Sequence, residues 1–297
     1  MSTTDWVLLM VLSVLWGGAF FFNEIALREL PVLSVVAGRV SIAAIVLWVV
    51  ALVRGHQFPH NARLWLWFLI MGLANNVLPF SFIVFGQTTI TAGLASILNA
   101  TTPFFIVIII ALFVRDEAVS KLKIAGLVIG FLGVVVMLGP DILGIDSASL
   151  LGQFAVLCAA LSYAIAGIYG RRFHSAGISP ILAAAGQVTM SAILLIPTAL
   201  AIDDMPNVAT ISGTTWMSIA GLALFSTALA YIIYFKLLSS AGAVNVMLVT
   251  LLIPVSALLL GTFLLNEPVR PLEIIGMTII GAALIIIDGR LLTLKKN

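Results

Sequence analysis

The stretch FVRDEAV at residues 113–119 returns near the other end of the chain as FLLNEPV at residues 263–269. Phe, Glu and Val coincide in the two copies, and each Glu is followed nine residues later by a glycine, Gly126 or Gly276. Similarity at one fixed offset, here about 150 residues, is typical of an internal repeat. The two stretches therefore predict that the chain consists of two related halves.

Three earlier pairs of segments match at nearly the same offset. They are Ala92-Gly93 with Ala241-Gly242, Gly38-Arg39-Val40-Ser41 with Gly186-Gln187-Val188-Thr189, and Trp16 with Tyr163. We expect the first half to occupy residues 1–140 and the second half residues 150–290, with residues 291–297 as a tail.

The composition of the chain is that of a membrane protein. Hydrophobic residues make up 62% of it and charged residues 9%, and its mean hydropathy is +1.23; a soluble domain carries roughly 25% charged residues. Ten apolar runs come close to the roughly 20 helical residues that cross a hydrocarbon core of about 30 Å, without the alternation of β-barrel strands. The runs cover 6–23, 31–53, 64–85, 93–114, 122–139, 150–170, 179–202, 214–236, 243–265 and 271–288. We expect an all-α membrane protein with ten transmembrane helices.

The basic residues predict the orientation of these helices. In a ten-helix arrangement only Arg28 and Arg270 fall at helix ends on one side of the membrane. The other side receives Arg54, Arg63, Arg115, Lys121, Lys123, Arg171, Arg172, Lys236, Arg290, Lys295 and Lys296. Because Lys and Arg collect on the cytoplasmic side, we expect both termini in the cytoplasm.

Each half holds five of the ten runs, which is an odd number. The second half must therefore enter the membrane from the opposite face, and the two halves form inverted five-helix repeats. Many secondary transporters have this architecture, since exchanging the conformations of the halves converts an inward-open cavity into an outward-open one. A duplicated scaffold without transport is the alternative.

The chain resembles a known family in these features. The two five-helix repeats, the pattern GRVSIAA at residues 38–44, the Glu and Gly spacing, and Pro103 and Pro254 are similar to the EamA-type repeats of the drug/metabolite transporter superfamily. Within it, the chain most resembles the bacterial aromatic amino acid exporters. The resemblance implies a multi-pass protein of the cell inner membrane that exports amino acids or similar metabolites.

Arg39 is the only Lys or Arg deep inside an apolar run. A cation at that depth must be paired or face water. It is a candidate to bind a substrate carboxylate, or alternatively to fix helix packing through main-chain carbonyls or Asn side chains. Its counterpart in the second half is the neutral Gln187, so the pair is asymmetric.

Asn75 and Asn76 fall near the middle of the third run, where an amide that faces lipid would be costly. Because an amide can accept from an ammonium and donate to a carboxylate, they are candidates for the polar end of a zwitterion site. An interhelical hydrogen bond is the alternative. Asn99 and Thr101 extend the same polar seam on the fourth run.

Two aromatic residues lie too deep for the belts at the membrane surface. Trp16 and Tyr163 occupy equivalent positions, and we expect them to line a central pocket for an apolar or aromatic side chain, with ordinary packing as the alternative. Tyr231 and Tyr234 lie nearer the cytoplasmic end of the eighth run, where we expect belt residues.

Three prolines interrupt the backbone hydrogen bonding of their runs. Pro79, Pro103 and Pro254 are candidate hinges, with static bends as the alternative. Gly126 and Gly130 form a face of small residues on the fifth run that is suited to close helix packing.

The chain lacks the usual sequence signatures of membrane enzymes and ATP-driven pumps. It has no His-Glu-x-x-His motif and no phosphate-binding loop, and its single cysteine, Cys158, excludes an intrachain disulfide. We expect a transporter and not an enzyme, with no metal or cofactor. Its partners would be a small-molecule substrate and the lipid bilayer, with no nucleic acid. The alternatives are export of other metabolites or cationic drugs, and a membrane enzyme that acts on lipid.

Overall fold

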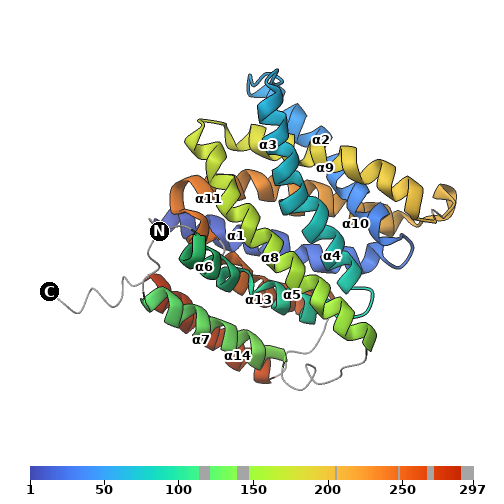
Figure 1. Cartoon of the computed structure of the whole chain (residues 1–297). Coiled ribbons are helices and arrows are strands. Elements are labelled where there is room, and N and C mark those ends of the chain that lie inside the picture. Colours follow the sequence, from blue (N-terminus) through green and yellow to red (C-terminus); the bar gives the residue numbers. More distant parts are fainter. Residues whose placement is uncertain (114–120, 139–146, 205, 247, 266–270, 289–297) are drawn as a thin grey trace.

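A computed structural model describes residues 1–113, 121–138, 147–204, 206–246, 248–265 and 271–288 (Figure 1). In this part of the chain the regular structure is entirely helical. The stretches 114–119 and 266–269, which revealed the repeat, lie outside the described residues.

Among the described residues, the first half contains seven α-helices and one π-helix, which joins α3 to α4. They are α1 (Thr3–Ala26), α2 (Val32–Val53), α3 (Ala62–Gly72), the π-helix η1 (Leu73–Val77), α4 (Leu78–Gly86), α5 (Ala92–Asn99), α6 (Thr102–Phe113) and α7 (Lys121–Leu138). The second half contains α8 (Ser147–Ser175), α9 (Pro180–Ile202), the 3-10 turn η3 (Val208–Thr210), α10 (Gly213–Ala223), the π-helix η4 (Leu224–Leu229), α11 (Ala230–Ala241), α12 (Ala243–Val246), α13 (Val249–Leu265) and α14 (Pro271–Asp288).

Seven helices, some of them continuous through a break, are long and apolar enough to cross a membrane among the described residues. Three shorter apolar helices cover 124–136, 249–260 and 274–287. Large apolar side chains such as Ile45, Leu112 and Leu200 are exposed on the outside of the bundle, as expected where lipid is the solvent. The prediction of a helical membrane protein is confirmed.

Hydroxyl and amide side chains define where several helices begin. Ser2 and Asp5 form a capping box at the start of α1, where each side chain bonds the other residue's backbone N–H. Thr91, Ser179 and Ser212 cap α5, α9 and α10 in the same general way by accepting a backbone N–H.

The packing of the helices is symmetric with respect to the two halves. Exchanging each helix for its counterpart in the other half gives a helix pair that is also in contact. The helix α2 packs against its own counterpart α9, and α7 packs against its counterpart α14. The pair α1 and α13 has its equivalent in the pair α8 and α6, and α3 with α9 has its equivalent in α10 with α2. The packing therefore follows the repeat in the sequence.

The predicted small-residue face of α7 is confirmed. A Cβ atom added at Gly126 would lie 3.1 Å from the carbonyl of Ala283, and one at Gly133 would lie 2.9 Å from the carbonyl of Gly276, both on α14. Gly130 also faces Ala283. Figure 1 shows α7 and α14 together along one edge of the bundle. Missing side chains allow these backbones to approach closely.

Four of the ten expected runs are interrupted, at corresponding places in the two halves. The third and eighth contain the π-helices η1 and η4, and the fourth and ninth divide between α5 and α6 and between α12 and α13. A π-helix and a helix break both leave main-chain carbonyls without their usual partners, and such places are frequent at functional sites.

Candidate functional site

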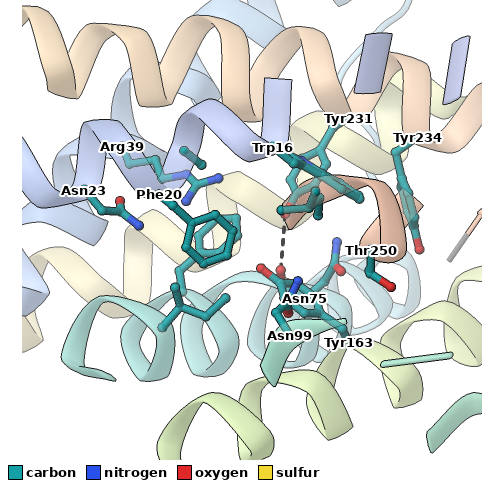
Figure 2. Close-up of a pocket in the computed structure, with 14 residues that line it drawn as sticks. Trp16, Phe20, Asn23, Arg39, Asn75, Asn99, Tyr163, Tyr231, Tyr234 and Thr250 are labelled. Atoms are coloured by element: carbon teal, nitrogen blue, oxygen red, sulfur yellow. Dashed lines mark hydrogen bonds between the residues drawn. The ribbon is translucent and has the colours of Figure 1, made fainter. Parts of the chain in front are cut away.

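A pocket of about 600 Å³, including its opening, lies among the broken helices. Figure 2 shows its side chains converging from both halves of the chain. It is lined by Trp16, Ala19, Phe20, Asn23, Arg39, Asn75, Phe80, Ile83, Asn99, Tyr163, Tyr231, Tyr234, Thr250 and Ile253. Its mostly apolar wall with a few polar groups is typical of a small-molecule site.

Arg39 of α2 provides the charge of this pocket and is 4% exposed. Its Nε donates to the Thr227 hydroxyl at 2.7 Å, and one terminal nitrogen donates to the Ser226 carbonyl at 3.1 Å. Its Cζ lies 3.6 Å from the centroid of the Phe80 ring, a cation–π contact. Among the residues that the structure describes, no Asp or Glu lines the pocket, so this wall holds a cation without an acidic partner.

The two bonds of Arg39 show how η4 is stabilised. The Ser226 carbonyl and the Thr227 hydroxyl both belong to this π-helix, and the Thr227 hydroxyl itself donates to the Leu222 carbonyl at 2.7 Å. The packing role considered for Arg39 is therefore present. A second terminal nitrogen has no hydrogen-bond partner among the described residues, so the same side chain retains a donor for a ligand.

The amides of η1 are held by the second half in an equivalent way. Asn75 Nδ2 donates to Gln187 Oε1 at 3.1 Å, and Asn76 Nδ2 donates to Ser191 Oγ at 2.8 Å, both on α9. The Tyr231 hydroxyl bonds Asn76 Oδ1 and donates to the Asn75 carbonyl at 3.1 Å. These are the interhelical bonds of the alternative interpretation. Asn75 still lines the pocket, whereas Asn76 and Gln187 lie behind its wall.

Side chains from other helices also satisfy the backbone of η1 and its flank. Ser162 of α8 donates to the Ala74 carbonyl at 2.7 Å, and Ser191 donates to the Gly72 carbonyl at 3.2 Å. In a membrane each carbonyl left without a donor would be costly. The irregular backbone is thus stabilised within the bundle.

The aromatic residues of the second half correct one expectation. Tyr231 and Tyr234 are each 1% exposed and line the pocket, so the prediction of belt residues was wrong. They are three residues apart and therefore lie on one face of α11. The ring of Tyr234 lies 5.7 Å from that of Trp16, and Tyr163 packs near Phe80 with centroids 6.4 Å apart. Trp16 and Tyr163 line the pocket as expected.

Of the two candidates on the fourth run, one lines the pocket and the other does not. Asn99 lines the pocket at the end of α5. Thr101 does not, because it lies in the break after α5, where its hydroxyl donates to the Leu98 carbonyl at 2.6 Å.

The prolines lie beside the breaks. Pro79 is in the first turn of α4 directly after η1, and Pro103 is in the first turn of α6. Pro254 lies inside α13, a few residues beyond the break that precedes this helix. In the first turn a proline replaces an N–H that would have no intrahelical partner. The interruption next to Pro103 therefore comes before the proline, and not within a continuous helix.

Sequence reasoning missed Asn23 and the apolar wall of the pocket. Asn23 Nδ2 donates to Gln87 Oε1 at 3.0 Å, and Gln87 Nε2 donates to the Phe20 carbonyl at 3.0 Å. Asn23 lies about two turns after Trp16 on α1, and that helical spacing was the available signal. Phe20, Phe80, Ile83 and Ile253 carry no comparable signal, because apolar residues fill every run.

Known proteins are similar to this chain in sequence and in fold. The profile of the EamA-like transporter family matches residues 4–139 and 150–288. The chain is 25% identical over 276 residues to an uncharacterized transporter of Bacillus subtilis named YoaV, covering 92% of this chain and 94% of that protein.

Two further comparisons extend the likeness. The chain is 29% identical over 294 residues to a probable amino-acid metabolite efflux pump of Escherichia coli, covering 96% of this chain and 95% of that protein. A solved crystal structure has a TM-score of 0.79 and 18% identity, covering 97% of this chain and 99% of the other, and shows that the fold is shared. A family profile that matches both halves, on a helical bundle of this shape, makes the chain a member of the EamA-like transporter family, within the drug/metabolite transporter superfamily.

Proposed function

We propose that the protein is a secondary transporter that exports amino acids with aromatic or other apolar side chains across the inner membrane by alternating access. The observation that carries this proposal is Arg39, a cation without an acidic partner in the wall of an otherwise aromatic and apolar pocket. A carboxylate is the natural partner for its remaining donor. The similarity to an amino-acid metabolite efflux pump supports the direction and the substrate class.

The second group of the zwitterion would bind at Asn99. Asn99 Oδ1 is buried and has no hydrogen-bond partner among the described residues. An amide oxygen accepts hydrogen bonds, so it suits an ammonium and disfavours a carboxylate. Figure 2 shows Asn99 and Arg39 on different sides of the pocket, so the carboxylate and the ammonium of a zwitterion would meet different residues.

The apolar wall would hold the substrate side chain. Phe20, Phe80, Ile83 and Ile253 come from the three helices α1, α4 and α13 and present only hydrocarbon. A side chain buried against them is favoured by roughly 25 cal/mol per Å² of apolar surface. Amino acids with small polar side chains would gain little from this wall.

Ten crossings with both termini in the cytoplasm complete the proposal. The two repeats would be residues 1–140 and 150–290, with a cytoplasmic tail at 291–297. The seven long helices, the three shorter apolar helices and the paired packing support this topology. Pro79, Pro103 and Pro254 would be hinges, because they adjoin the interruptions of their helices.

The other functions fit the pocket less well. A cationic drug would meet the charge of Arg39 directly. An enzyme that acts on lipid would need a nucleophile or a general acid, and the described residues of the pocket wall include no carboxylate, histidine or cysteine. Export of other carboxylate-bearing metabolites remains the second candidate, because Arg39 alone would recognise them.

Counterflow in liposomes tests the proposal. Purified protein would be reconstituted into vesicles loaded with an unlabelled amino acid, and uptake of the labelled compound would be followed. We expect counterflow of L-tryptophan, L-tyrosine, L-phenylalanine and L-leucine, and competition by these acids but not by amines that lack the carboxylate, such as phenethylamine. Competition by phenethylamine as strong as that by L-phenylalanine would contradict the role of Arg39. Chemical conversion of the labelled compound would indicate an enzyme.

A further inference from the structure

Tyr234 carries a buried polar atom that the fold does not use. The residue is 1% exposed, and its hydroxyl has no hydrogen-bond partner among the described residues. Tyr231, one turn earlier on the same helix, uses its hydroxyl to bond η1. Because a buried hydroxyl without a partner is costly, packing alone would favour phenylalanine at position 234.

The ring of Tyr234 lies among other aromatic rings. The Tyr234 ring lies 5.7 Å from Trp16, 6.2 Å from Tyr231 and 5.1 Å from Phe235, with each pair tilted or edge-on. Planar rings prefer tilted and edge-to-face contacts of this kind. This part of the pocket is therefore suited to a further aromatic ring supplied by a ligand.

The position of Tyr234 relative to Arg39 indicates which part of the ligand it meets. Figure 2 shows the two residues at opposite ends of the pocket, with Trp16 and Tyr231 between them. An amino acid held by its carboxylate at Arg39 would extend its side chain past Trp16 toward Tyr234. The hydroxyl would then face the tip of that side chain.

We infer that Tyr234 determines specificity by bonding a polar atom at the tip of an aromatic side chain. A tyrosine hydroxyl can accept from an indole N–H and can donate to, or accept from, a phenol hydroxyl. The pocket would thus prefer tryptophan and tyrosine to phenylalanine. This inference rests on the proposed transport of amino acids and names the preferred subclass.

The magnitude follows from the hydrogen bond that phenylalanine cannot make. A site with a buried group intended for a hydrogen bond rejects a ligand without the partner atom, since the group then stays unpaired. One such bond gives a preference of about tenfold in affinity. The Tyr234→Phe variant removes the unpaired hydroxyl, so we expect it to bind L-phenylalanine at least as tightly as the wild type does.

The test measures the affinities of L-tryptophan, L-tyrosine and L-phenylalanine for the purified wild type, for Tyr234→Phe and for Tyr169→Phe. Tyr169 is the matched control because it lies outside the pocket, where its hydroxyl accepts from Arg172 at 3.0 Å. We expect a preference of about tenfold for tryptophan and tyrosine in the wild type and in Tyr169→Phe, and none in Tyr234→Phe. A ligand-side measurement serves if Tyr234→Phe does not fold: benzothienylalanine, in which sulfur replaces the indole N–H, should bind the wild type like phenylalanine.

The opposing outcomes are distinct. Equal affinities for the three amino acids in the wild type, or a preference that persists in Tyr234→Phe, would overturn the inference and leave amino acid transport standing. If the wild type bound the three amino acids equally well, water alone would satisfy the Tyr234 hydroxyl. Absence of binding and of counterflow for all three amino acids would overturn the proposed function together with this inference.

Discussion

Tyr231 and Tyr234 lie on one helix, but only the hydroxyl of Tyr231 is hydrogen-bonded among the described residues. A change from Tyr to Phe at each position therefore tests what these hydrogen bonds contribute. Changing Tyr231 to Phe removes the donor to the Asn75 carbonyl and the partner of Asn76 Oδ1, and the Asn76 side chain is fully buried. Changing Tyr234 to Phe removes a hydroxyl without a partner. Both variants keep an aromatic ring of the same shape, so their difference isolates the hydrogen bonds.

The free energy of unfolding should separate the two variants. Removing the donor of a buried acceptor costs about 1–3 kcal/mol in soluble proteins, while hydrogen bonds between membrane helices average about 0.6 and reach about 1.7 kcal/mol. We therefore expect Tyr231→Phe to be less stable by about 1–2 kcal/mol. At about 2–4 °C per kcal/mol, this lowers Tm by about 2–8 °C. Tyr234→Phe should keep or raise the wild-type Tm.

Thermal unfolding of the detergent-solubilised protein without amino acid provides the measurement. Fluorescence-detected size exclusion after heating would follow the loss of folded protein, with both variants and the wild type in the same detergent. An equal loss in the two variants would contradict the bonding described here. So would a larger loss in Tyr234→Phe.

Three further predictions concern helix packing, pH and the hinges. Gly133→Ala should destabilise the protein by about 1–3 kcal/mol, because its Cβ would meet the Gly276 carbonyl. The control is Gly281→Ala, where a Cβ meets nothing within 4 Å; this variant should have the wild-type stability or a higher one in the same unfolding assay. Glu29 accepts the Ser212 N–H at 2.8 Å, and this bond and the bond from Thr215 hold the pKa of the Glu29 carboxyl below its ordinary 4.5. The stabilising effect of the Glu29 carboxylate should therefore be present above pH 4.5 and be lost as the pH falls further. A Glu29→Gln variant whose unfolding depends on pH as that of the wild type does would contradict this. Pro254→Ala should slow exchange in liposomes more than it weakens binding in detergent, whereas Pro197→Ala in the unbroken helix α9 should leave exchange unchanged; wild-type exchange in Pro254→Ala would exclude its hinge role.

Hydropathy and the internal repeat predicted the parts of the fold that depend on long apolar segments. The helices form where the runs are, and the glycine face of α7 packs on α14 as expected. The interruptions were not predicted, because hydropathy does not distinguish a π-helix from an α-helix. A π-helix is selected by which side chains can satisfy its carbonyls, and those side chains come from distant segments such as Ser162 and Arg39.

The candidate site was predicted best where depth and polarity coincide in one residue. Trp16, Arg39, Asn75, Asn99 and Tyr163 all line the pocket. The sequence could not separate residues that face the pocket from those one position away, such as Asn76, whose amide bonds Ser191 instead. Tyr231 and Tyr234 were misplaced for the same reason, since depth along a helix does not reveal which way its face points.

The residues at equivalent positions 39 and 187 hold equivalent π-helices by different chemistry. Arg39 donates to η4, whereas Gln187 accepts from η1. Two identical copies of the first half, assembled as a homodimer, would bring two guanidinium groups to one cavity, where they would repel each other. Joining the halves in one polypeptide permits a single cation instead. The cavity thereby has one charged end, and a carboxylate-bearing solute bound as proposed would lie in it with that group at Arg39.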